Sequence, residues 1–320
     1  MTHTEKIFAA GHALLIGVGG ADIPKTVDDA KALADILKDQ ERCAYPPEQV
    51  KLLTGQDADR NRILDALDKV AQSSDINSTI IIYFSGHGSQ ITSSIGEAYF
   101  LIPHGYDINR LNKTAISGAE FAAKLRALKA KKILLLLDCC HAGGIGEAKG
   151  LEIAKAPLPP EALEVLGCGS GRVIIASSQA DESSFAGEPY SAFTLALIES
   201  LCGIGVARKD GFVRVADLAM HAREAVPGRT KNKQHPILSF EQADNFVVAY
   251  YSGGDSSTKA LPFQELPEIE PEPGAWQNEF NQKQNAGTQT NIVGDVNGPI
   301  LSGIFRGPVN ILEGRRRRKT

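Results

Sequence analysis

The feature that most constrains the fold is a series of short, mostly apolar runs bounded by polar or glycine-containing sequence. Residues 133–137 read ILLLL, residues 79–84 read TIIIYF, and residues 172–176 read RVIIA. Apolar runs without alternation are typical of strands that are buried on both faces of a parallel sheet. Segments with helical spacing alternate with these runs. We therefore predict an α/β fold in which helices flank a mostly parallel sheet.

The composition divides the chain into three parts. Residues 1–254 carry the strand and helix patterns and are predicted to form one folded domain. Pro, Glu and Gln dominate residues 255–287, which predicts a flexible, disordered linker. Residues 288–320 are rich in Gly, Asn and β-branched residues, so we predict a short β-prone tail motif with a basic end.

Charge and cysteine usage exclude several classes of protein. The net charge of −4 gives no reason to expect a nucleic-acid partner. No apolar run approaches the roughly 20 residues of a membrane span, and the first residues lack a signal-peptide layout, so we expect a cytoplasmic protein. The five cysteines are odd in number and irregularly spaced, which favours reduced thiols. Zinc is not expected, because there is no CxxC pair and no HExxH segment.

Reactive side chains follow two of the apolar runs. Asp138, Cys139 and Cys140 come directly after residues 133–137, and His87 follows residues 79–84 within the sequence SGHG. The carboxyl ends of parallel strands meet at one edge of a sheet, where ligands bind. A thiol becomes a nucleophile when a neighbouring base takes its proton. Taken singly, His87 could be a turn histidine and either cysteine an inert thiol, but their occurrence together favours catalysis.

These motifs resemble those of a known family. YFSGHGSQ (residues 83–90) and DCCHAGG (residues 138–144) resemble the His and Cys boxes of caspase-like cysteine peptidases, in the metacaspase and bacterial caspase-like branch. The resemblance extends to ALLIGV, VDDAKAL and residues 176–197, and it covers about residues 10–250. It implies a caspase–haemoglobinase fold and hydrolysis of peptide bonds by a Cys–His dyad.

The resemblance also implies a role for each matching residue. Cys140 would be the nucleophile and His87 the general base and acid, because the metacaspase box has the form Asp-x-Cys-His-Ser-Gly. Cys139 is then a bystander, and Ala142 is a small departure from the Ser of that box. The backbone N–H groups of Gly88 and Cys140 would form the oxyanion hole.

Metacaspases cut after Arg or Lys and use an acidic first-subsite (S1) pocket. Asp29, Ser85 and Asp138 match that pocket, and two carboxylates facing a guanidinium would give charge-assisted recognition. The predicted partner is therefore a protein or peptide substrate with a basic residue at the cleavage site. Asp138 could instead cap a helix, and Asp29 could be an exposed helix residue.

Metal binding is predicted to play little part. Metacaspases often need calcium, which takes six or more oxygen ligands. Downstream of the His box, residues 90–107 offer only Glu97 and Asp107 as carboxylates. We therefore predict no cofactor and expect no strong calcium requirement.

The tail brings in a second class of function. Residues 288–312 resemble the amyloid-type signalling motifs of some death-related proteins, so they are predicted to mediate self-association or binding to a sensor protein, the alternative being a merely disordered tail. The favoured function is an endopeptidase in bacterial stress, defence or cell-death signalling. One alternative is a non-catalytic recruitment protein that uses the caspase-like domain as a scaffold. Another is a thiol-dependent acyl transferase or redox enzyme.

Overall fold

The computed structural model describes residues 7–21, 23–93, 96–140, 152–155, 166, 171–179, 182, 187–240 and 243–263. For residues 91–93, 96–97, 140 and 152–155 this description covers the backbone only. The remaining residues of the Cys box, 141–144, and the tail motif, 288–312, lie outside the described residues. The tail predictions therefore stay predictions.

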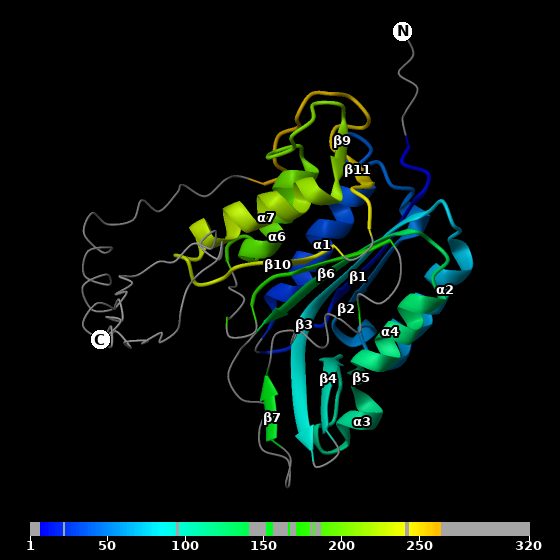
Figure 1. Ribbon diagram of the computed structural model, residues 1–320, viewed down its shortest axis with the longest axis vertical. Coiled ribbons are helices and arrows are strands. Elements are labelled where there is room, and N and C mark those ends of the chain that lie inside the picture. The colour runs from blue at the N-terminus through cyan, green and yellow to red at the C-terminus, as the bar shows by residue number, and fades with distance from the viewer. Residues whose placement is uncertain are drawn as a thin grey trace, which may run out of the picture. The chain divides into compact units, whose positions relative to one another are not determined.

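Nine strands of the described chain form one sheet (Figure 1). Its main path runs β10 (Ile237–Ser239), β8 (Arg172–Ala176), β6 (Lys132–Cys140), β3 (Thr79–Ser93), β1 (Gly11–Gly17) and β2 (Val50–Thr54). All neighbours on this path are parallel except β10, which pairs with β8 in the antiparallel sense. The predicted α/β fold with a mostly parallel sheet is confirmed.

Helices cover both faces of the sheet. One face packs against α1 (Lys25–Lys38), α6 (Ala192–Leu201) and α7 (Val215–Arg229), and the other against α2 (Arg60–Ser73) and α4 (Gly118–Ala127). Alternate residues of each strand belong to the two resulting apolar clusters, because successive strand side chains point to opposite faces. We call the side covered by α1, α6 and α7 the α1 face.

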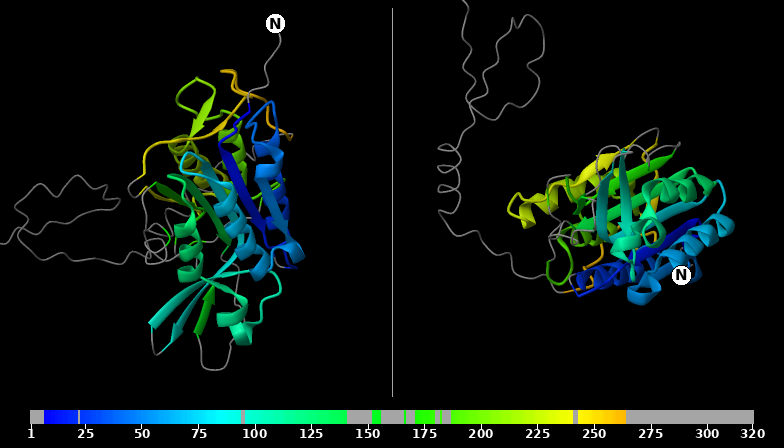
Figure 2. Two further views of the ribbon diagram at one scale, coloured as in Figure 1. Left: turned by 90° about the vertical axis from the view of Figure 1, so that its right-hand side faces the viewer. Right: turned by 90° about the horizontal axis from the view of Figure 1, so that it is seen from below.

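Strand β3 is much longer than its apolar run. The run at residues 79–84 predicts a strand that ends before His87, whereas β3 continues to Ser93. It continues because it changes partners: β4 (Gly96–Ile102) and β7 (Glu152–Lys155) pair with its second half. This extension projects beyond the helices that cover the two faces of the sheet, as Figure 1 and the left view of Figure 2 show. Similarly, β6 does not stop at Leu137 but includes Asp138 and both cysteines.

The smaller elements complete the domain. They are α3 (Leu111–Thr114), β5 (Ile116–Ser117), the two-stranded sheet of β9 (Phe212–Arg214) and β11 (Val247–Tyr250), and the 3-10 turns Pro47–Gln49, Gly55–Asp57 and Ile108–Arg110. The apolar residues 246–250 predict β11 from sequence, whereas the other elements are too short to show a periodicity. Among the described residues no helix combines the length and apolar character needed to cross a bilayer.

The packed chain continues past Gly254. Arg42 donates a hydrogen bond from Nη2 to the carbonyl oxygen of Ala260 (2.8 Å), and Leu261 packs against the apolar cluster of the α1 face. The Phe263 ring lies edge-on to Tyr190, with 5.6 Å between ring centroids. Residues 255–263 therefore contact the folded domain, and the division of the chain into domain, linker and tail stays a prediction beyond that point.

Candidate active site

The α1 face of the sheet carries three successive rows of residues, one above another. The first row, counted toward the carboxyl ends of the strands, is apolar. It consists of register partners on adjacent strands, namely Leu15, Tyr83, Leu136 and Ile175. Two residues further along each strand, Gly17 pairs with Ser85, and Ser85 pairs with Asp138. Because positions two apart in a strand share a face, this polar row lies on the same face as the apolar one.

The third row holds the two residues predicted to be catalytic. His87 and Cys140 are register partners in the parallel ladder of β3 and β6, two positions beyond Ser85 and Asp138. Neighbouring strands are about 4.8 Å apart, so the register brings the two positions side by side on the α1 face. His87 is buried, and it also pairs with Ile102 of β4. The side chain of Cys140 lies outside the described residues.

Cys139 lies on the opposite face. Its side chain belongs to the apolar cluster under α2 and α4 and is 3% exposed. Burial, with the neighbouring Asp138 as a minor cause, raises the pKa of the Cys139 thiol to about 12, although a hydrogen bond with Tyr99 opposes the shift. A thiol with that pKa is not a nucleophile at neutral pH, since the thiolate is the reactive form.

Helix α1 reaches the polar row because β1 has a glycine there. A Cβ atom on Gly17 would lie 2.3 Å from the carbonyl oxygen of Thr26 and 2.9 Å from the Cβ of Ala30, so only glycine allows α1 to approach this closely. Close approach places Asp29, one turn into the helix, over the row. Asp29 is 2% exposed, so it is not the exposed helix residue that its sequence position also allowed.

One serine connects the two carboxylates. The backbone N–H of Ser191 donates to Oδ1 of Asp29 (2.9 Å), and its hydroxyl donates to Oδ2 of Asp138 (2.9 Å). Asp138 is fully buried in β6 and caps no helix. The structure thus brings Asp29, Ser85 and Asp138 together, and it adds Ser191 to the set.

The acidic pair has an electrostatic cost. Burial, followed by repulsion from Asp138, raises the pKa of the Asp29 carboxyl to about 7, while the hydrogen bonds from Ser191 and the charge of Lys25 oppose the shift. Lys25 forms its ion pair with Glu188 (Nζ to Oε1, 2.9 Å) rather than with Asp29. Two buried carboxylates at a sheet edge favour a cationic ligand, which would remove this cost.

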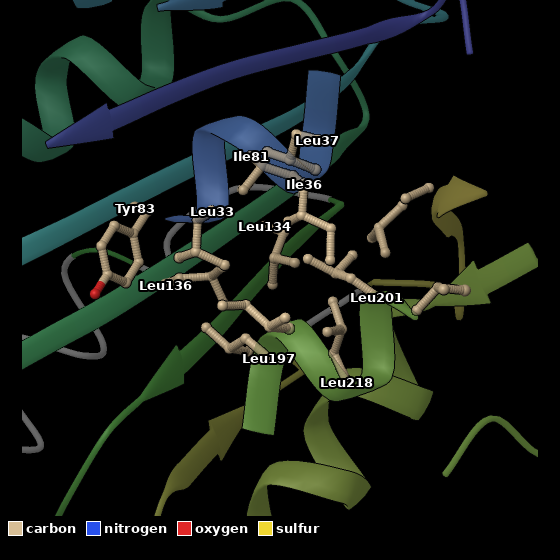
Figure 3. Close-up of a cluster of buried hydrophobic side chains, with 14 of the residues drawn as sticks. Leu33, Ile36, Leu37, Ile81, Tyr83, Leu134, Leu136, Leu197, Leu201 and Leu218 are labelled. Carbon is tan, nitrogen blue, oxygen red and sulfur yellow. The ribbon is translucent and has the colours of Figure 1, made fainter. Parts of the chain in front are cut away.

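Polar groups beneath the pair mark the border between core and site. The hydroxyl of Tyr83 lies 3.0 Å from Oγ1 of Thr194 on α6. Figure 3 shows this hydroxyl turned away from the surrounding leucines. Burial, then the charges of Asp138 and Asp29, raises the pKa of the Tyr83 phenol well above its usual value. The phenol is therefore neutral beside the two carboxylates.

A further serine extends the polar row. Ser177 follows β8 and donates its N–H to the carbonyl oxygen of Leu137 (2.8 Å), which sets it level with Asp138. Its hydroxyl is buried and has no hydrogen-bond partner within the described part of the chain. Sequence analysis did not single out Ser177 or Ser191. The signal for Ser191 was its place directly before the apolar helix 192–201, which is typical of an N-cap.

Glu97 and Asp107 are the two carboxylates considered for calcium, and of these the structure describes the side chain of Asp107 alone. Asp107 accepts hydrogen bonds from Arg110 Nε (2.8 Å) and from the backbone of Asn109 (3.0 Å), so its carboxylate caps a local turn. The side chain of Glu97 lies outside the description. Within the described residues there is no group of three or more His, Cys, Asp or Glu side chains that could hold a metal ion. That the protein has no strong calcium requirement stays a prediction.

Comparison with known proteins identifies a family. The family model described as "Caspase domain" matches residues 10–247. Among solved structures, the crystal structure of protein GSU0716 from Geobacter sulfurreducens matches with a TM-score of 0.48 and 17% identity, covering 72% of this chain and 92% of that one. A likeness at that level supports no argument about this chain. The search of curated proteins found no match.

Proposed function

Because this chain belongs to the caspase-domain family of peptidases, we propose that it is a cysteine endopeptidase that cleaves peptide bonds after Arg or Lys. The observation that carries the proposal is the register of β3 and β6. It sets His87 beside Cys140 and, two positions earlier, Ser85 beside Asp138. A nucleophile position, a base and an acidic pocket thus follow one another along two adjacent strands.

In this proposal Cys140 and His87 form the dyad. His87 takes the proton of the Cys140 thiol, and the thiolate attacks the carbonyl carbon of the scissile bond. The backbone N–H groups of Gly88 and Cys140 stabilise the oxyanion, and His87 returns the proton to the leaving amine. Water then hydrolyses the thioester, so protein groups and water supply the whole reaction.

The substrate side chain enters beside the dyad. Asp29 and Asp138 accept hydrogen bonds from its guanidinium or ammonium group, and Ser85 lies between Gly17 of β1 and Asp138 of β6 in the same polar row. A cation that replaces water between two buried carboxylates gains charge-assisted hydrogen bonds. It also lowers the pKa of Asp29, which burial and Asp138 hold near 7 in the free protein.

Four peptides that differ only at the cleaved position test the proposal. We expect the wild type to cut those with Arg and Lys and to leave those with Asp and Gln intact. Replacing either dyad residue, by Cys140→Ala or His87→Ala, should lower kcat by at least about 10³-fold, because each removes a group that acts in the transition state. Release of the new carboxyl terminus distinguishes hydrolysis from acyl transfer.

Cys139 provides a matched control one residue away. Because its thiol is buried on the other face, Cys139→Ala should keep the activity of the wild type once both proteins are confirmed to be folded. Full activity in Cys140→Ala, or complete loss in Cys139→Ala, contradicts the assigned nucleophile. Cleavage of the Asp peptide alone contradicts the assigned pocket.

A further inference from the structure

Ser191 occupies the point where the two carboxylates and a helix terminus meet. It is 3% exposed, and its N–H and O–H donate to Asp29 and Asp138 respectively, each over 2.9 Å. Its Oγ also accepts the backbone N–H of Thr194 (3.1 Å), which makes it the N-cap of α6. The sequence separates these groups widely, since Asp29, Asp138 and Ser191 lie on α1, β6 and the start of α6.

Its hydroxyl has little choice of direction. One lone pair accepts the Thr194 N–H, so the hydroxyl proton points to the carboxylate of Asp138. An ionised carboxylate accepts hydrogen bonds and donates none, so each bond from Ser191 favours the charged form. The N-terminal end of α6, with its partial positive charge, acts in the same sense.

We propose that Ser191 is a positioning residue for substrate specificity: it holds Asp29 and Asp138 apart and ionised, so that the pair can receive a basic side chain. This inference rests on the proposed function, since it assigns a role within the same pocket. Ser191 does not contact the reacting atoms. It acts equally on the bound substrate and on the transition state, so its loss should raise KM and leave kcat nearly unchanged.

Two substitutions remove or keep the hydroxyl. Ser191→Gly removes the hydroxyl but keeps the backbone N–H that donates to Asp29. Glycine at an N-cap lowers helix stability only slightly, so the variant should fold. Ser191→Thr keeps the hydroxyl. Ser117→Ala is the matched control: Ser117 caps α4 by accepting the N–H of Glu120 (3.2 Å), and α4 covers the opposite face of the sheet.

The expected result has a kinetic part and a pH part. A hydrogen bond to a charged group corresponds to about a 10- to 100-fold change, so kcat/KM for an Arg peptide should fall by about that factor in Ser191→Gly, through KM. The acid limb of its pH profile should move to higher pH, because the variant loses the Ser191 side chain, which lowers the pKa of the Asp29 carboxyl, together with its hydrogen bond to Asp138. The charged and titratable groups that face Asp29 are Asp138 on β6, Lys25 on its own helix and the phenols of Tyr83 and Tyr190, and all four are unchanged in the variant. Ser191→Thr should restore the profile, and Ser117→Ala should leave it in place.

A second readout needs no substrate. The pH dependence of the unfolding free energy, compared between Ser191→Gly and wild type, shows the change in titration of the buried Asp29 carboxyl, because the other titrating groups are common to both proteins. Ser191→Gly should extend the fall of this free energy to higher pH. If wild type cuts no basic peptide, the proposed function fails, and this second measurement still decides the role of Ser191. Unchanged KM and unchanged pH dependence in Ser191→Gly, or equal changes in Ser191→Gly and Ser117→Ala, overturn the inference.

Discussion

Replacing Asp29 by Asn tests the pocket by two measurements, because it should raise the free energy of unfolding and lower the activity on an Arg peptide. Asp29 is 2% exposed, and burial with the neighbouring Asp138 raises the pKa of its carboxyl from 3.8 to about 7. Each pKa unit corresponds to about 1.4 kcal/mol. Keeping Asp29 ionised above pH 7 therefore lowers the free energy of unfolding by at most about 4 kcal/mol. Asp29→Asn should recover part of this amount.

The direction of the pKa shift fixes the pH window. Between 3.8 and about 7 the folded protein holds more protons at Asp29 than the unfolded chain does, so stability falls as the pH rises. The penalty grows by about 2.3 kcal/mol between pH 5 and pH 7 and becomes constant at about pH 8. Asp29→Asn lacks this titration, so its advantage over wild type should widen across the same window.

Urea unfolding at pH 5, 6, 7 and 8 measures the effect. Asp28→Asn is the control, because Asp28 is the exposed acidic neighbour on the same helix. On an Arg peptide, Asp29→Asn should lower kcat/KM by about 30- to 150-fold, equivalent to about 2 to 3 kcal/mol for one partner of a buried charge pair.

Two results would refute this reasoning. One is a stability difference between Asp29→Asn and wild type that is the same at pH 5 and pH 8. The other is undiminished cleavage of the Arg peptide by Asp29→Asn. A variant that is both more stable and less active would show that the carboxylate is kept for recognition at the expense of stability.

Three further substitutions probe the support of the site. Gly17→Ala should destabilise the fold by about 1 to 3 kcal/mol in thermal unfolding and lower activity as well, because the new Cβ would lie 2.3 Å from the carbonyl oxygen of Thr26 and push α1 outward. Thr194→Val should lower the free energy of unfolding by about 1 kcal/mol, since it removes one of the two side-chain partners of the buried Tyr83 hydroxyl and leaves the other, Ser85. The buried Glu199 pairs with His221 and Arg229 of α7. Burial raises the pKa of its carboxyl, but these two partners lower it further than burial raises it. The contribution of Glu199 to the free energy of unfolding is present above the pKa of the unfolded chain and disappears as the pH falls through the pKa of the folded protein. Glu199→Gln should therefore destabilise the protein at pH 7 and much less in acid.

The sequence by itself determined the class of fold and which polar side chains follow its two central strands. Apolar runs of this length without alternation are typical of strands covered on both faces, so 133–137 and 79–84 predicted the central strands β6 and β3. The motifs that follow these runs placed His87 and the two adjacent cysteines at one sheet edge. These inferences succeeded because they depend on local pattern and on the parallel connection of strand and helix.

Only the tertiary structure decided on which face of the sheet each of these side chains lies and which residues it contacts. Strand alternation puts Cys139 into the core of one face and position 140 beside His87 on the other, and this depends on β6 continuing past its apolar run. The extension of β3 likewise depends on pairing with strands distant in sequence. Ser191 joins Asp29 and Asp138 through contacts across three elements. No local propensity encodes such contacts, because they arise from register and from the close approach of helices to the sheet.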